Sequence, residues 1–225
     1  MASHLDLEEQ EQLDQLKAFW KQWGNLITWG LTLVLAAFAA WQGWNFWQRD
    51  QAAKAGAMYE ELDRAIKSGD AAKAATVFKD LKERFPGTSY AAQGALQTAK
   101  LQFDKGQADA ARATLSWTAD NASEPADRDL ARLRLAGLQI DAKQYDEAGK
   151  SLDAVKSPDY AALVADRRGD LLLLQGKAEP ARAEYRKALA AIDKTLDYRQ
   201  LIEAKLASLG VATPQDASVT PEAAQ

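Results

Sequence analysis

The sequence contains no cysteine and a single histidine, His4, among its 225 residues. Without cysteine the chain can form no disulfide and can carry out no thiolate chemistry. A lone imidazole near the N-terminus offers no candidate for a histidine-based catalytic triad or a histidine-ligated metal site. No GxxxxGKS/T or GxGxxG phosphate-binding loop occurs either. We therefore predict that the protein is not an enzyme and uses no metal or cofactor.

Positive charge is not concentrated in any part of the chain. The 28 Lys and Arg residues are outnumbered by 32 Asp and Glu residues, which gives a formal net charge of −4. Nucleic-acid-binding domains usually present a basic stripe or a polybasic run. Neither is found here, so the sequence does not predict a nucleic-acid partner.

Residues 22–48 contain no charged side chain at all. At ~1.5 Å rise per residue, the apolar run 26–47 gives a helix of ~33 Å, enough to cross a hydrocarbon core of ~30 Å. We predict a transmembrane helix at residues 25–48 in the lipid bilayer, after a short acidic N-terminus at residues 1–24. Tryptophans near its two ends are expected at the membrane interface: Trp20, Trp23, Trp41, Trp44 and Trp47.

Two other interpretations of this run are less consistent with the sequence. A buried core helix of this length normally carries a polar face. A cleaved signal peptide begins with a basic region, whereas this N-terminus is acidic, and the apolar run continues past the small residues at 37–39. Lys17 and Lys21 before the run are matched by Arg49 and Lys54 after it, so the positive charges do not decide the orientation.

Residues 49–210 contain a repeat of about 33–37 residues, close to the length of a tetratricopeptide unit. Its small packing position is filled by Ala74, Ala111, Ala148 and Ala181. A large apolar residue follows four positions later in each copy: Phe78, Leu115, Leu152 and Tyr185. A turn residue precedes each alanine by five positions: Gly69, Gly106, Lys143 and Gly176. The last copy also has Gly169 at a consensus position. An alanine-rich bundle without repeats is the alternative, but four copies in one register favour repeats.

We therefore predict an all-α protein in which a single N-terminal transmembrane helix precedes a tetratricopeptide-like α-solenoid of about four helix pairs. A C-terminal capping helix is expected near residues 198–209, because the last repeat needs its apolar side covered. Residues 211–225 contain two prolines and few bulky side chains, so we predict a disordered tail.

The order of these segments resembles the ancillary SecYEG translocon subunit family. Local matches are residues 16–20 (LKAFW), 160–170 (YAALVADRRGD) and 202–206 (IEAKL). The resemblance implies a bacterial inner-membrane protein with a cytoplasmic N-terminus and a periplasmic repeat domain at residues 49–210. It also implies three kinds of partner: the SecYEG translocon, a membrane-anchored periplasmic foldase or chaperones, and exported client proteins.

The first helix of each repeat pair lines the concave face of a repeat stack, which forms a groove for a peptide or a partner helix. The repeat register places eight residues on this face: Tyr59, Asp63, Gln93, Leu96, Lys100, Phe103, Asp166 and Asp170. The set is apolar and weakly acidic, and it lacks the Lys and Asn residues that would clamp a C-terminal carboxylate.

Two other functional hypotheses remain at this point. The chain would be a generic membrane-anchored scaffold for envelope or cell-division assembly, or an enzyme with an accessory repeat domain. The second has little support, because the anchor and the repeats leave no sequence for a catalytic part.

Overall fold

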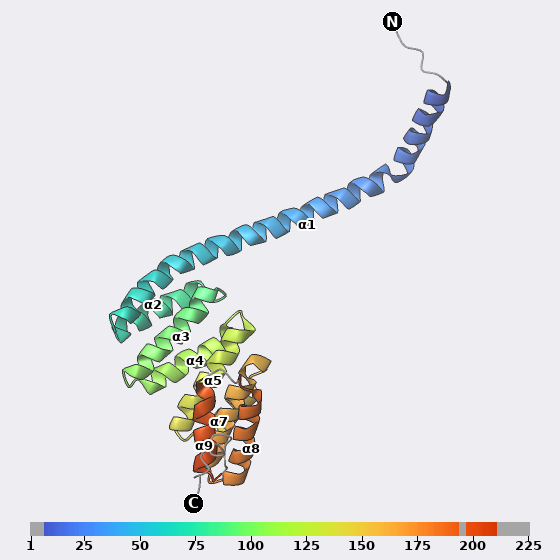
Figure 1. Cartoon of the computed structure of the whole chain (residues 1–225). Coiled ribbons are helices and arrows are strands. Elements are labelled where there is room, and N and C mark those ends of the chain that lie inside the picture. The colour runs from blue at the N-terminus through green and yellow to red at the C-terminus, as the bar shows by residue number, and fades with distance from the viewer. Residues whose placement is uncertain (1–6, 194–196, 211–225) are drawn as a thin grey trace, which may run out of the picture. The chain divides into compact units, whose positions relative to one another are not determined.

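The computed structural model describes residues 7–193 and 197–210, and every regular element in these ranges is helical (Figure 1). The chain divides into two compact units, residues 1–51 and 52–225. The first helix, α1 (Leu7–Lys67), runs through the boundary and extends beyond both ends of the predicted span. The predicted tail at residues 211–225 lies outside the described residues.

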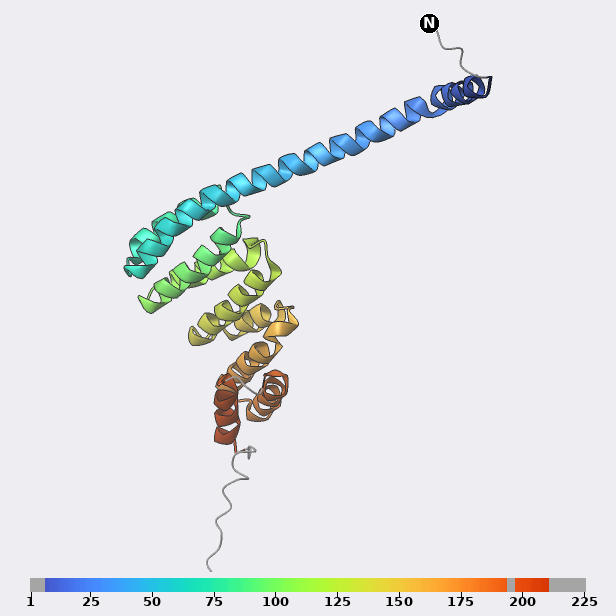
Figure 2. The same cartoon turned by 45° about the horizontal axis from the view of Figure 1, so that its top comes forward.

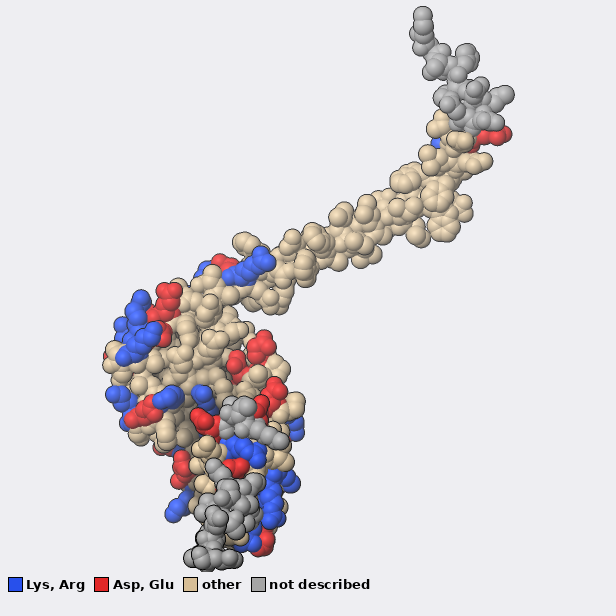
Figure 3. Space-filling model, viewed as in Figure 1, with Lys and Arg blue, Asp and Glu red and all other residues tan. Residues whose placement is uncertain are grey.

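The first unit consists of the N-terminal part of α1. Among the described residues, one helix is long and apolar enough to cross a membrane, and its apolar part is 6% buried. Trp29 and Leu33, for example, are 66% and 69% exposed. Figure 3 shows the apolar part of α1 as a stretch without charged side chains between charged ends. The five tryptophans expected at the interface are all exposed as well. A core helix would be covered by other elements, so this unit has the features of a membrane span.

The second unit is a succession of antiparallel helix pairs (Figure 2). The end of α1 pairs with α2 (Ala71–Arg84), and α3 (Ser89–Asp104) pairs with α4 (Ala108–Asn121). The third pair is α5 (Pro125–Asp141) and α6 (Tyr145–Asp153). A short 3-10 turn, η1 (Pro158–Tyr160), leads to the fourth pair, α7 (Ala161–Leu174) and α8 (Ala178–Ala191). The last helix is α9 (Tyr198–Ser208).

The turns within the four pairs share one backbone geometry. Gly69, Gly106, Lys143 and Gly176 have φ values of 70°, 74°, 59° and 76°. In each turn, the residue after this position donates its backbone N–H to a carbonyl five residues earlier, as Gln144 does to Gln139 at 2.8 Å. This is the Schellman end of a helix, which needs a left-handed residue and therefore favours glycine. Lys143 adopts the same conformation without being glycine.

The repeat alanines lie in the core of the second unit. Ala74, Ala111, Ala148 and Ala181 are completely buried. The large residues four positions later, namely Phe78, Leu115, Leu152 and Tyr185, are at most 3% exposed. The Tyr185 ring packs directly on Gly169, where an added Cβ would lie 2.4 Å from a ring carbon. A small residue is therefore required at that position.

Helix α9 covers the open side of the last pair. Ile202 and Leu206 are buried in one apolar cluster with Ala181, Tyr185 and Ala188 of α8. The predicted all-α fold of about four helix pairs with a capping helix is thus confirmed.

Candidate functional site

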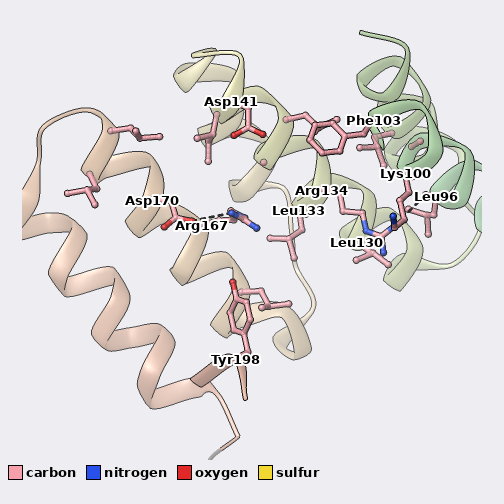
Figure 4. Close-up of a pocket in the computed structure, with 18 residues that line it drawn as sticks. Leu96, Lys100, Phe103, Leu130, Leu133, Arg134, Asp141, Arg167, Asp170 and Tyr198 are labelled. Carbon is pink, nitrogen blue, oxygen red and sulfur yellow. Dashed lines mark hydrogen bonds and ion pairs between the residues drawn. The ribbon is translucent and has the colours of Figure 1, made fainter. Parts of the chain in front are cut away.

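The second unit has a groove of about 790 Å³ between the first helices of its repeat pairs. Helices α3, α5 and α7 supply most of its wall, with single residues from α4 and α9 (Figure 4). In every pair, the Schellman turn returns the chain antiparallel to the first helix. The first helices therefore line this surface, and the second helices lie behind the first helices.

The wall of the groove is mainly apolar. Its large apolar side chains are Leu96, Phe103, Leu115, Leu130, Leu133, Leu138, Ile140, Leu163, Leu173 and Leu174. Beyond residue 51, the described part of the chain exposes five large apolar side chains, and three of them lie here. These are Phe103 (47% exposed), Leu173 (38%) and Leu174 (58%). Exposed apolar surface gathered in a concave site is typical of a binding surface.

Charged side chains of both signs lie among the apolar ones. Arg134 of α5 is exposed and donates a long hydrogen bond of 3.4 Å to the carbonyl oxygen of Leu96. Lys100 of α3 pairs with Asp104 at 2.6 Å. On the α7 side, Arg167 pairs with Asp170 at 3.2 Å (Figure 4). A partner segment would thus meet polar groups on both flanks of an apolar floor.

A buried polar network closes the α7 side of the groove. The Asp166 side chain is completely buried and accepts hydrogen bonds from Lys205 Nζ at 2.8 Å and from Tyr198 Oη at 2.7 Å. Lys205 also pairs with Asp170 at 2.7 Å, and Tyr185 Oη donates to Asp170 at 2.8 Å. The network therefore ties α7 to α8 and α9.

The two tyrosines of this network have raised pKa values. Burial is the main cause for both phenols, and it disfavours the phenolate. The hydrogen bond to Asp170 raises the pKa of Tyr185 further, and the hydrogen bond to Asp166 does the same for Tyr198. Both phenols therefore stay protonated as donors at neutral pH.

Four of the eight residues predicted on the concave face line the groove: Leu96, Lys100, Phe103 and Asp170. Asp166 is a correction, because its side chain is buried and bound by Lys205 and Tyr198 instead of facing a partner. Tyr59 and Asp63 lie on α1 away from the groove wall. Tyr59 Oη accepts a hydrogen bond from Gln97 at 2.6 Å, and Asp63 pairs with Lys67. Gln93 is exposed but does not line the groove.

None of the eight residues predicted on the concave face belongs to α5, although this helix contributes much of the groove wall. Leu130, Leu133, Arg134 and Gly137 form the middle of the groove wall. The signal was available, because the alanine register that aligns Ala111 with Ala148 also aligns Leu96 with Leu133 and Lys100 with Gly137. The contribution of Tyr198 had no such signal, since α9 lies outside the repeat register.

The groove has the features of a surface that binds a polypeptide segment. Within residues 11–193 and 197–210, no three His, Asp or Glu side chains gather closely enough to hold a metal ion. Of the charged groups in the wall, Lys100, Arg167 and Asp170 are engaged in ion pairs with other side chains, and Arg134 and Asp141 also line it. The arrangement suits contact with a polypeptide segment.

Repeated helix pairs, Schellman turns and a groove along the first helices define a tetratricopeptide-like α-solenoid that follows an apolar N-terminal helix. The family model of the tetratricopeptide repeat-like domain matches residues 17–211. Three relatives are each called "Ancillary SecYEG translocon subunit". The protein from Neisseria gonorrhoeae is 30% identical over 213 residues, which is 93% of this chain and 100% of the relative.

The Escherichia coli relative is 30% identical over 205 residues, covering 90% of this chain and 97% of its own. The relative from Haemophilus influenzae is 28% identical over 81% of this chain and 89% of its own. The chain therefore belongs to the ancillary SecYEG translocon subunit family.

Proposed function

We propose that this protein is an inner-membrane ancillary subunit of the SecYEG translocon. The observation that carries the proposal is similarity at 30% identity over 93% of this chain to a relative named for that role. The exposed apolar part of α1 supports an anchor in the bilayer. In this arrangement the N-terminus is cytoplasmic and the repeat unit is periplasmic.

The repeat unit binds emerging exported proteins and presents them to periplasmic chaperones or a membrane-anchored foldase. The apolar groove between α3, α5 and α7 is the surface for these contacts. An amphipathic segment of a client or partner would place its apolar side over Phe103, Leu173 and Leu174 and its polar edge toward Arg134. Burial of these exposed side chains would provide the main part of the binding free energy.

Because the protein is anchored in the membrane, its groove can bind emerging chains with low intrinsic affinity and still be effective. A binding site held at the membrane next to the channel meets emerging chains at a raised effective concentration, so contacts of low intrinsic affinity are enough. Low affinity also allows a client to be released to the next partner. The proposed role is therefore one of binding and transfer, without catalysis.

Site-specific photo-crosslinking in cells tests the groove. We expect a photoreactive amino acid at Phe103 or Leu173 to form adducts with exported clients or periplasmic chaperones. The matched control is Ala183, which is exposed on α8 and outside the groove wall. Equal adduct patterns at all three positions would show that the groove has no special role, and a membrane-anchored scaffold would then explain the protein better.

A further inference from the structure

A second uncovered apolar surface lies on α1 before the transmembrane run. Five large apolar side chains occur between residues 11 and 23, and they are 41–62% exposed: Leu13, Leu16, Phe19, Trp20 and Trp23. At about 100° per residue, all five fall within an arc of about 120° on the helix. The segment is therefore amphipathic, in contrast to the run that follows it, which is apolar on all sides.

The rest of the segment's circumference is polar or small. Glu11, Asp14, Ala18 and Gln22 face away from the apolar arc, and Lys17 beside the arc pairs with Asp14 at 3.1 Å. With Lys21 included, the segment carries two acidic and two basic side chains. Its attraction to a surface must therefore come from apolar burial, since its charges balance.

The position of the segment next to the span limits where its apolar arc can go. A straight continuation of the helix would carry Leu13 about 18 Å beyond the start of the span at residue 25, well into water. Five large apolar side chains would then be hydrated, at a cost of about 25 cal/mol per Å² of apolar surface. A helix in the plane of the interface buries the same side chains. Trp20 and Trp23 are typical of that layer.

The junction between the two segments permits such a change of direction. Figures 1 and 2 both show α1 bending near its N-terminal end, between the darkest blue segment and the blue segment that follows. Gly24 lies at the start of the span, and three atoms of the Trp20 ring lie 3.2 Å from the position that a Cβ there would take. A glycine is a common site of helix bending.

We propose that residues 11–23 form an interfacial helix that lies along the bilayer surface, with Leu13, Leu16, Phe19, Trp20 and Trp23 inserted among the lipid headgroups. The occupant of this apolar face is the lipid of the leaflet in which the span begins. The inference rests on the span and is independent of the groove.

Thiol labelling of the full-length protein tests this inference, because the chain has no cysteine of its own. Two variants probe the apolar arc, Leu16→Cys and Phe19→Cys, and two matched variants probe the polar side, Ala18→Cys and Gln22→Cys. The protein is placed at one copy per nanodisc of phosphatidylethanolamine and phosphatidylglycerol, where both membrane surfaces are open to a charged maleimide. Leu33→Cys in the span is the protected reference, and labelling in sodium dodecyl sulfate checks that every thiol can react.

We expect the thiols at residues 18 and 22 to be labelled and the thiols at residues 16 and 19 to be protected. The same pattern should persist in phosphatidylcholine nanodiscs, since the segment's charges balance. Full labelling at all four positions would overturn the proposal. Protection of residues 16 and 19 that appeared only after translocon was added would also overturn it, because it would assign the apolar face to a protein partner. Protection of all four at the level of Leu33 would also overturn it, because the segment would then lie inside the hydrocarbon core.

Discussion

At the scale of single residues, the turn positions carry most of the information about the repeats. The sequence register placed Lys143 with three glycines, and the structure gives it the same left-handed backbone. That agreement was predictable because the turn geometry depends on local backbone hydrogen bonds. Lysine has a Cβ and is strained at this φ of 59°, whereas glycine is not.

We therefore predict that Lys143→Gly stabilises the repeat unit by about 1 kcal/mol. Urea denaturation of the full-length protein in mild detergent, followed by circular dichroism, measures the change in unfolding free energy. Lys79→Gly is the control, because Lys79 is exposed inside α2, where glycine should cost about 1 kcal/mol. A loss of stability in both variants would contradict the strain at residue 143.

The buried alanines give a second prediction at this scale. Ala148→Leu and Ala181→Leu should each destabilise the protein by about 1–3 kcal/mol, because the added atoms overpack a completely buried helix contact. Ala183→Leu, on the exposed side of α8, should have little effect. The same denaturation measurement applies, and equal effects at all three positions would mean that the alanine register has no structural role.

Asp166 shows where prediction from single residues fails. The repeat register correctly places it on a first helix, α7. Its burial depends on Lys205 and Tyr198, which belong to α9 and follow it by more than 30 residues in the sequence. A periodic pattern identifies a helix face, but it does not identify a nonrepeating helix that covers that face.

At the scale of helices and loops, Asp129 holds the connection between α6 and α7. Its carboxylate is buried and accepts hydrogen bonds from the backbone N–H groups of Lys156 at 3.0 Å and Ser157 at 2.8 Å. Burial alone would raise the pKa of Asp129. The two backbone N–H groups and Arg132 outweigh that effect, so the pKa lies below its usual value of 3.8.

Because folding lowers the pKa of Asp129, its charged carboxylate stabilises the fold at pH values above the unfolded-state pKa. This contribution is lost as pH falls below about 3.8. We predict that Asp129→Asn lowers the unfolding free energy by about 1–3 kcal/mol at pH 7. The difference from the unmodified protein should shrink as pH falls below 3.8. Denaturation curves between pH 7 and pH 3 check this, with Asp146→Asn as the control, because Asp146 is exposed on α6. A difference that stays constant over this range would contradict the role of the charge.

The helices of the groove were only partly predictable. Leu96, Lys100 and Phe103 followed from the register on α3, and the same register would have given Leu133 and Gly137 on α5. The exposure of Leu173 and Leu174 could not be derived in this way, because it depends on how closely the neighbouring first helices approach. Side-chain packing between repeats, and not the repeat itself, shapes the groove.

At the scale of the whole molecule, orientation is the first property to measure. The charges beside the span are balanced, so the predicted cytoplasmic N-terminus comes from the family. We predict that an impermeant thiol reagent added to cells with a permeable outer membrane labels Ser116→Cys, on the exposed side of α4, but not Ser3→Cys. Lysed cells give the control, since both positions should then react. The reverse pattern in intact cells would place the repeats in the cytoplasm.

The most direct test of the central claim is copurification with the channel. Full-length protein extracted in mild detergent should enrich SecYEG subunits over a control in which an unrelated single apolar helix carries the same repeat unit. The reason is that an ancillary translocon subunit must stay bound to the channel when the surrounding lipid is removed. Enrichment over this control is the result predicted here. Equal recovery of channel subunits with both proteins would contradict the account and favour a membrane-anchored scaffold that is not linked to the translocon.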